Sequence, residues 1–143
     1  MNNSFPPFHL AFPVKNLLET KFFYTNYLGC SVGRTSNNWI DFNFYGHQIT
    51  AHLSPSSCDV INNNKVDGQS VPVRHFGLIM DWDDWHQLKN KFESNKTKFV
   101  VEPYTRYEDQ PGSQATMFIK DPSGNHLEFK SFRDDGAIFD PSW

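Results

Sequence analysis

The sequence predicts an α+β protein made of two similar halves, each with one strand, one helix and two or three further strands. Three observations predict this class. Two apolar, strand-like segments begin at His9 and His75, and each leads into a segment whose apolar residues recur at helical spacing. Short segments bounded by turn residues follow each helix. At 143 residues, the chain is long enough for one domain or two small fused modules.

The first half begins with the strand at 8–14. A helix is expected over 16–28, and Gly29 would end it because glycine readily adopts the left-handed conformation. Apolar and polar residues alternate at 39–44, which predicts a strand. A Tyr-Gly turn separates it from another strand at 48–53.

The second half repeats this plan after the strand at His75. Its helix is expected over 81–92, where the acidic start suits a helix N-terminus. A strand is expected at 98–102, and a hairpin is formed by 115–119 and 127–132. The sequence Asp-Pro-Ser-Gly between these two strands is strong turn chemistry, because proline presets one backbone angle and glycine accepts a positive φ.

These elements divide the chain into module one at about 8–53, a linker at about 54–71, module two at about 72–132 and a tail at 133–143. The linker is predicted because the region is polar and rich in Ser, Asn and Gly. Exposed apolar residues in the tail would suit docking against a second subunit, so we expect a homodimer. The tail residues concerned are Ile138, Phe139 and Trp143.

Composition excludes several classes of function. The net charge is −3 and the basic residues are scattered, so no nucleic-acid partner is expected. No apolar run approaches the roughly 20 residues that span a bilayer, and the first residues do not form a signal peptide. We therefore expect a cytoplasmic protein with reduced Cys30 and Cys58, which lack the spacing of a thiolate metal site. An aromatic share of 16% leaves rings to line a pocket for a flat or apolar ligand.

Glu128 lies within an apolar strand and points away from Leu127 and Phe129, so it faces solvent or a strong partner. His9 and His75 hold similar places at the starts of the two halves. Each of the three residues alone would be an ordinary core or surface side chain. Together, on repeated elements, they predict a metal site with two imidazoles and one carboxylate.

The internal repeat adds a fourth position, on the strand that follows Gly46. Thr50 and His52 share one face of that strand, so the alternation of side chains does not choose between them. Ligand chemistry favours His52. The alternative is a histidine that lines the pocket without binding metal.

Four segments together resemble the vicinal oxygen chelate superfamily, which includes glyoxalase I, extradiol dioxygenases, and bleomycin- and fosfomycin-resistance proteins. They are Phe8–Val14, Phe22–Cys30, Arg74–Gly77 and Asp121–Glu128. The resemblance implies paired βαβββ modules that form a cupped, half-open mixed sheet with helices on the outside and a metal in the cup. It also implies ligands at His9, His75 and Glu128.

The same resemblance bears on the strand of His52. Glyoxalase I members tend to have glutamate or glutamine at the fourth position, so a histidine there departs from a plain glyoxalase. The ligand set favours an extradiol-type dioxygenase with Fe(II), because two histidines and one carboxylate leave positions open for substrate and oxygen. With Zn²⁺, Ni²⁺ or Mn²⁺ the site suits a glyoxalase-like isomerase, lyase or epimerase. A non-catalytic, small-molecule-binding resistance protein is the third alternative.

Four further residues are candidates for the active site. His126 lies two residues before Glu128 on the same face and is a candidate acid or base, or else makes a cross-strand polar contact. A polar loop is expected at 103–114. Its Tyr104, Arg106 and Tyr107 would bind an anionic or phenolic substrate if the loop borders the site. The alternative is an ordinary solvated hairpin loop.

Overall fold

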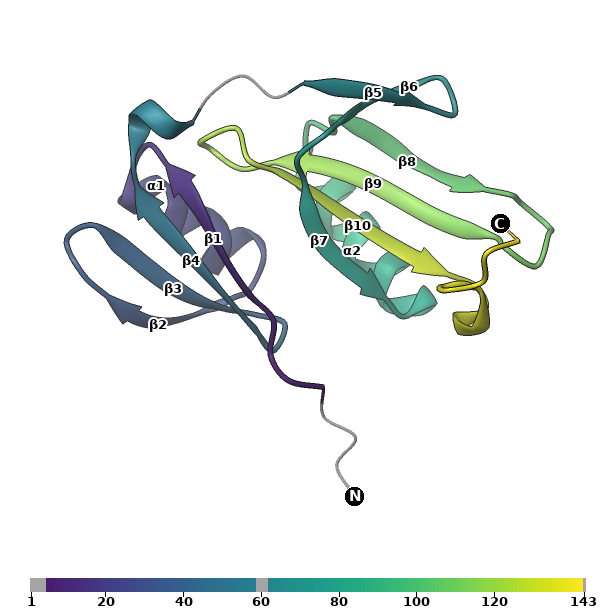
Figure 1. The fold of residues 1–143 in the computed structure, drawn as a ribbon, viewed down its shortest axis with the longest axis horizontal. Helices are drawn as coiled ribbons and strands as arrows, with labels where there is room; N and C mark the ends of the chain where they lie inside the picture. Colours follow the sequence, from purple (N-terminus) through teal and green to yellow (C-terminus); the bar gives the residue numbers. More distant parts are fainter. Residues whose placement is uncertain (1–4, 59–61, 143) are drawn as a thin grey trace. The chain divides into compact units, whose positions relative to one another are not determined.

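The computed structural model describes residues 5–58 and 62–142, so Trp143 of the predicted tail lies outside the described residues. The chain divides into two compact units. Residues 1–60 and 121–125 form the first, and residues 61–120 and 126–143 form the second. Each unit contains one four-stranded mixed sheet and one main helix (Figure 1).

The first unit has the order of strand, helix and three strands that the family resemblance implies; the residues themselves predicted only the last two of these three strands. Its sheet has the order β1-β4-β3-β2, with β1 parallel to β4 and the other neighbours antiparallel. The elements are β1 (His9–Val14), α1 (Leu17–Phe22), a π-helical turn (Phe23–Tyr27), β2 (Ser31–Thr35), β3 (Trp39–Phe44) and β4 (His47–Leu53). The side chain of Asn16 caps α1 by accepting from the backbone N–H of Glu19 at 2.9 Å. Gly29 has a φ of +74°, as expected of a glycine that ends a helix.

The second unit repeats this topology, with the order β7-β10-β9-β8 and β7 parallel to β10. Its elements are β7 (Phe76–Met80), α2 (Trp82–Ser94), β8 (Val101–Arg106), β9 (Gln114–Lys120) and β10 (His126–Phe132). The α+β class and the paired βαβββ modules are therefore confirmed. Both sheets are open rather than closed into a barrel.

Each helix covers one face of its own sheet, because alternate strand residues on that face are apolar (Figure 1). On β10, Leu127 and Phe129 are fully buried and face α2. Glu128 faces the other side, as the alternation along the strand predicted. The buried Trp85 of α2 donates its indole N–H to the Phe129 carbonyl at 2.8 Å. The helix thus fixes the strand that carries Glu128 from behind.

The turn at 121–125 belongs to the first unit. Asp121 Oδ1 accepts backbone N–H bonds from Ser123 and Asn125, both at 2.9 Å, and Asp121 Oδ2 accepts the hydroxyl of buried Tyr24 at 2.9 Å. Burial raises the pKa of Asp121, although these bonds oppose the shift. The same burial raises the pKa of Tyr24.

Two expectations for irregular structure were wrong. The polar region predicted as a linker contains a hairpin, β5 (Asn63–Val66) and β6 (Gln69–Pro72). Its turn is Asp67-Gly68, with φ values of +52° and +77°, the geometry that an Asp-Gly pair supplies in a tight hairpin. The loop expected from residue 103 begins only after Arg106, because β8 continues through Pro103; an edge strand tolerates proline.

The remaining elements are two short 3-10 turns, Pro55–Ser57 and Asp135–Ala137. In the tail, Phe139 exposes 93% of its surface. None of the helices described is long and apolar enough to cross a membrane.

Candidate active site

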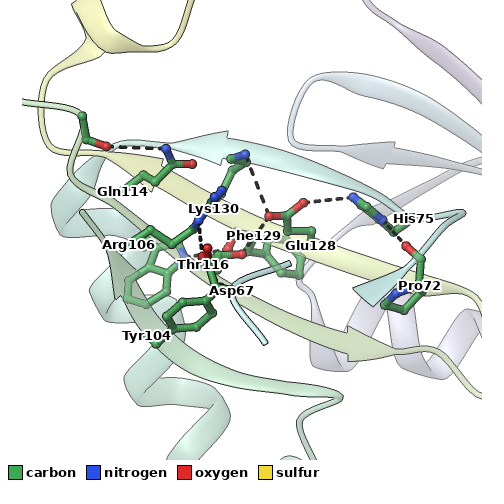
Figure 2. Close-up of polar contacts among 12 residues, drawn as sticks. Asp67, Pro72, His75, Tyr104, Arg106, Gln114, Thr116, Glu128, Phe129 and Lys130 are labelled. Carbon is green, nitrogen blue, oxygen red and sulfur yellow. Dashed lines mark hydrogen bonds and ion pairs between the residues drawn. The ribbon is translucent and has the colours of Figure 1, made fainter. Parts of the chain in front are cut away.

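His75 and Glu128 meet on the open face of the second sheet, the face opposite α2. His75 Nε2 lies 3.0 Å from Glu128 Oε2 (Figure 2). The register of the sheet brings them together, because Gly77 on β7 pairs with Glu128 on β10, and His75 stands just before β7. A Cβ atom at Gly77 would overlap the backbone carbonyl oxygen of Glu128. Glycine is therefore required for the two strands to approach this closely.

The hydrogen bond at the other ring nitrogen of His75 determines which tautomer faces Glu128. His75 Nδ1 lies 2.7 Å from the Pro72 carbonyl oxygen. A carbonyl only accepts, so Nδ1 carries a proton, and the lone pair of neutral His75 lies on Nε2, facing the carboxylate. Two electron-rich atoms facing each other need a cation between them, either a proton or a metal ion. In the metal-free protein that cation is a proton, and the hydrogen bond to Glu128 raises the pKa of His75 despite partial burial.

Two further side chains hold Glu128. Thr116 donates its hydroxyl to Oε1 at 2.8 Å, and Lys130 Nζ lies 4.0 Å from the same oxygen. Burial alone would raise the pKa of Glu128, but the bonds from His75 and Thr116 and the charge of Lys130 together lower it. The carboxylate is therefore ionised and held in place, as a metal ligand must be.

A second polar group lies on the same face, over β8. Asp67, from the β5–β6 turn, accepts on Oδ2 both the Nε–H of Arg106, at 2.5 Å, and the hydroxyl of Tyr104, at 3.1 Å (Figure 2). Tyr104 pairs with Thr116 across β8 and β9, which places this group beside the Glu128 pair. Arg106 also donates to the Tyr107 hydroxyl at 3.3 Å, with its guanidinium 5.1 Å from the ring centre. The structure thus brings Tyr104, Arg106 and Tyr107 together.

The other predicted site residues are placed as follows. His126 is half-buried on β10, on the same face as Glu128. His9 and His52 are exposed on the first unit, where His9 pairs with Gln48 and His52 pairs with Pro13. These two pairs are four residues apart along the strands, so the Cα atoms of Gln48 and His52 are about 13 Å apart. Within either unit, no three His, Cys, Asp or Glu side chains among the described residues are close enough to hold a metal.

Comparison of the two registers identifies the fourth position of the repeat. In the second module, the residue two positions after His75 pairs with Glu128. In the first module, the residue two positions after His9 is Ala11, which pairs with Thr50. By the same comparison His52 matches Lys130. Thr50 is therefore the counterpart of Glu128, a position that alternation along one strand could not assign.

The surroundings of Thr50 differ from those of Glu128. Thr50 is buried and donates its hydroxyl to Asp41 Oδ1 at 2.6 Å, and Asp41 Oδ2 accepts from Arg34 Nε at 3.2 Å. An open hollow of about 330 Å³, lined in part by Arg34, Asp41 and Gln48, adjoins this group. The sequence-based predictions did not include Asp41. The signal was its place in the alternating segment 39–44, between apolar residues that point to the opposite face of the strand.

The comparisons with known proteins agree with this architecture. The model of the Glyoxalase/Bleomycin resistance protein/Dioxygenase superfamily matches residues 7–129. A crystal structure described as glyoxalase/bleomycin resistance protein/dioxygenase from Alicyclobacillus acidocaldarius is 31% identical. The similarity covers 97% of this chain and 100% of that one, with a TM-score of 0.78. No curated protein shows a significant match.

More distant structures share the fold. Lactoylglutathione lyase from Agrobacterium tumefaciens is 14% identical over 91% of this chain and 96% of its own, with a TM-score of 0.61. The fosfomycin resistance protein FosX from Listeria monocytogenes is 13% identical over 96% of this chain and 100% of its own, with a TM-score of 0.63. The resemblance drawn from the sequence is confirmed. With a family match over residues 7–129 and a 31% identical relative along nearly its whole length, the chain belongs to the glyoxalase/bleomycin resistance protein/dioxygenase superfamily.

Proposed function

We propose that the protein is a metal-dependent enzyme of extradiol-dioxygenase type, acting on a small, aromatic substrate that binds the metal through neighbouring oxygens. The observation that carries the proposal is the His75–Glu128 pair. Its imidazole nitrogen and carboxylate oxygen converge at 3.0 Å, and the Pro72 carbonyl sets the imidazole tautomer. Histidines that bind metals characteristically donate their other N–H to such an acceptor.

The ligand set supports oxygen chemistry over a glyoxalase reaction. His75 and Glu128 would hold the ion in the second unit, and His9 stays the predicted third ligand. The fourth position of the repeat is Thr50, whose hydroxyl is bound to Asp41. Two imidazoles and one carboxylate with open positions are typical of non-haem Fe(II) oxygenases. An Fe(II) ion there would supply one-electron chemistry with dioxygen. His52 was predicted from the sequence as a fourth ligand; because the register matches it to Lys130 rather than to Glu128, we propose a site without it.

The protein's own side chains would do the remaining work. Tyr104 and Arg106 lie on the same sheet face as Glu128 and carry hydrogen-bond donors suited to an anionic or phenolic group. His126 lies two residues from Glu128 on that face and would move a proton to or from the substrate. Thr116 would keep the carboxylate of Glu128 oriented.

Metal content tests the proposal most directly. The full chain is purified without chelator or added metal, and its metals are quantified by elemental mass spectrometry. Glu128→Ala is compared with Glu102→Ala, which removes an exposed carboxylate from β8 of the same sheet. We expect near-stoichiometric iron in the wild type and Glu102→Ala but not in Glu128→Ala, together with Fe(II)-dependent oxygen uptake on a panel of catechols.

Other metals would change the reaction class. Nickel, zinc or manganese lost in Glu128→Ala would support a glyoxalase-like isomerase, lyase or epimerase, with turnover in the absence of oxygen. No metal in any protein, even after reconstitution with each ion, would overturn the metalloenzyme proposal.

A non-catalytic binding protein is the second candidate, because within either unit no three ligand-type side chains among those described converge and the His75–Glu128 pair is satisfied without a metal. This candidate requires that ligand binding survive both metal stripping and His75→Ala. A bleomycin-type drug followed by calorimetry is the probe.

We also propose a homodimer, formed in part by the tail. Phe139 is 93% exposed, a high value for a large apolar side chain. Light scattering of the wild type and Phe139→Ser measures the mass. A monomer for the wild type at micromolar concentration would contradict this proposal.

A further inference from the structure

We propose that Arg106 and Tyr104 form a carboxylate-binding niche that Asp67 fills in the free protein, so that a ligand carboxylate enters by displacing Asp67 and the tip of its hairpin. The inference rests on the proposed function only in taking this ligand to be the substrate of that enzyme. The niche itself is defined by side chains that bind a carboxylate in the structure.

The contacts of Asp67 show what the niche recognises. A single carboxylate oxygen, Oδ2, accepts from the Arg106 guanidinium and from the Tyr104 hydroxyl. One donor is charged and the other is neutral, and bonds from a guanidinium to a carboxylate are among the stronger hydrogen bonds in proteins. The Arg106 side chain is 22% exposed, and that of Asp67 is 39% exposed. The niche is therefore partly covered but can be reached from solvent.

The tip of the hairpin that presents Asp67 is suited to moving away, whereas the buried Pro72 anchors the other end of β6. Every residue of β5 except Val66 is exposed, as are the first two residues of β6. Two-stranded hairpins are marginally stable unless they pack against something else. Among the side chains described, Asp67 makes the hydrogen bonds that tie the hairpin tip to β8. A competing carboxylate would take over the donors that hold this tip.

The niche is also close enough to the His75–Glu128 pair for one small ligand to contact both. Tyr104 pairs with Thr116, and the Thr116 hydroxyl donates to Glu128. The strands that carry Tyr104 and Glu128 are two strand spacings apart, about 10 Å. A small molecule with a carboxylate at one end and metal-binding oxygens at the other spans such a distance. We therefore assign the niche to the carboxylate end of the substrate.

The hairpin sets the apparent affinity of the niche. A site that is open for only a fraction of the time binds its ligand more weakly by that fraction. If Asp67 fills the niche nine times in ten, its removal strengthens carboxylate binding about tenfold. Asp67→Asn removes the negative charge and keeps the turn, because asparagine tolerates the positive φ found at this position.

The test uses full-length protein kept metal-free with EDTA and sodium benzoate as the probe. Binding is followed by NMR through the Arg106 side-chain Nε–H resonance. Asp109→Asn is the matched control, since Asp109 is another acidic residue with a positive φ, +61°, in the same unit. Benzamide is the neutral control ligand. Arg106→Gln, followed through backbone amides, removes the guanidinium.

We expect the benzoate Kd of Asp67→Asn to be about tenfold below those of the wild type and Asp109→Asn. Benzamide should not bind, and Arg106→Gln should lose benzoate. Equal benzoate Kd values in the wild type and Asp67→Asn would overturn the inference, as would binding that survives Arg106→Gln. Because no metal is present, these outcomes are independent of the metal test with Glu128→Ala, so the two proposals can fail separately.

Discussion

Thr50 occupies in the first module the position that Glu128 occupies in the second, because each pairs with the residue two places after the histidine of its module. The two positions have opposite chemistry. Glu128 receives a hydroxyl bond from Thr116 and is ionised, whereas Thr50 gives its own hydroxyl bond to Asp41. The repeated fold therefore carries a carboxylate of ligand type at one of these two positions.

This relationship predicts different effects for the two histidines of the first unit. His52→Ala should leave metal content unchanged, because His52 corresponds to Lys130 rather than to Glu128. His9→Ala should lower metal content well below stoichiometry, since His9 corresponds to His75. Elemental mass spectrometry of both variants, purified side by side, checks this. Loss of metal in His52→Ala with retention in His9→Ala would show that the register does not select the ligands.

Gly77→Ala should destabilise the second unit, because the added methyl would overlap the Glu128 carbonyl and push β7 from β10. Overpacking of this kind should lower the free energy of unfolding, measured by urea denaturation, by about 1–3 kcal/mol. Gly33→Ala is the control. Its Cβ would lie 3.3 Å from the Asp41 Cβ, a tight contact without overlap, so a smaller loss is expected. Equal stability of wild type and Gly77→Ala would contradict the close approach of the strands.

Thr116→Val should weaken metal binding without unfolding the protein. The two side chains have nearly the same shape, but valine cannot donate to Glu128 Oε1. Removing a partner that orients a metal ligand typically lowers metal affinity about 10- to 100-fold. A chelator competition titration measures the change. Thr105→Val, one position along from the partner of Thr116 on β8, serves as the control and should bind metal as the wild type does.

Asp121 predicts a dependence of stability on pH. Its pKa is raised by burial, so the folded protein binds its proton more tightly than the unfolded chain does. The stability this gives is present below the unfolded pKa, about 3.9, and is lost as pH rises through the raised folded value. The free energy of unfolding of the wild type, measured relative to Asp121→Asn, should therefore fall as pH rises from about 3.9 through the raised pKa of folded Asp121. A difference that stays constant from pH 3 to 7 would show that Asp121 titrates alike in both states.

Much of the fold could be predicted from the sequence, because its signals are local. Gly29 ends the first helical segment, and the alternation along 127–132 gave the facing of Glu128. The hairpin at β5 and β6 was missed because its strands have only four residues each and are mostly polar, with no clear alternation, although Asp67-Gly68 was a turn signal. The choice of Thr50 over His52 depends on pairing with a strand about 40 residues away, which no local pattern contains.

The bond from Trp85 to the Phe129 carbonyl provides a spectroscopic probe of the site. Trp85 is 2% exposed and is linked by one hydrogen bond to the residue next to Glu128, on the opposite side of the strand. Its fluorescence therefore monitors the backbone beneath the carboxylate without contact between the indole and any ligand. A variant that retains Trp85 as its sole tryptophan would report strand movement on ligand binding as a change in light emission, in solution and in real time.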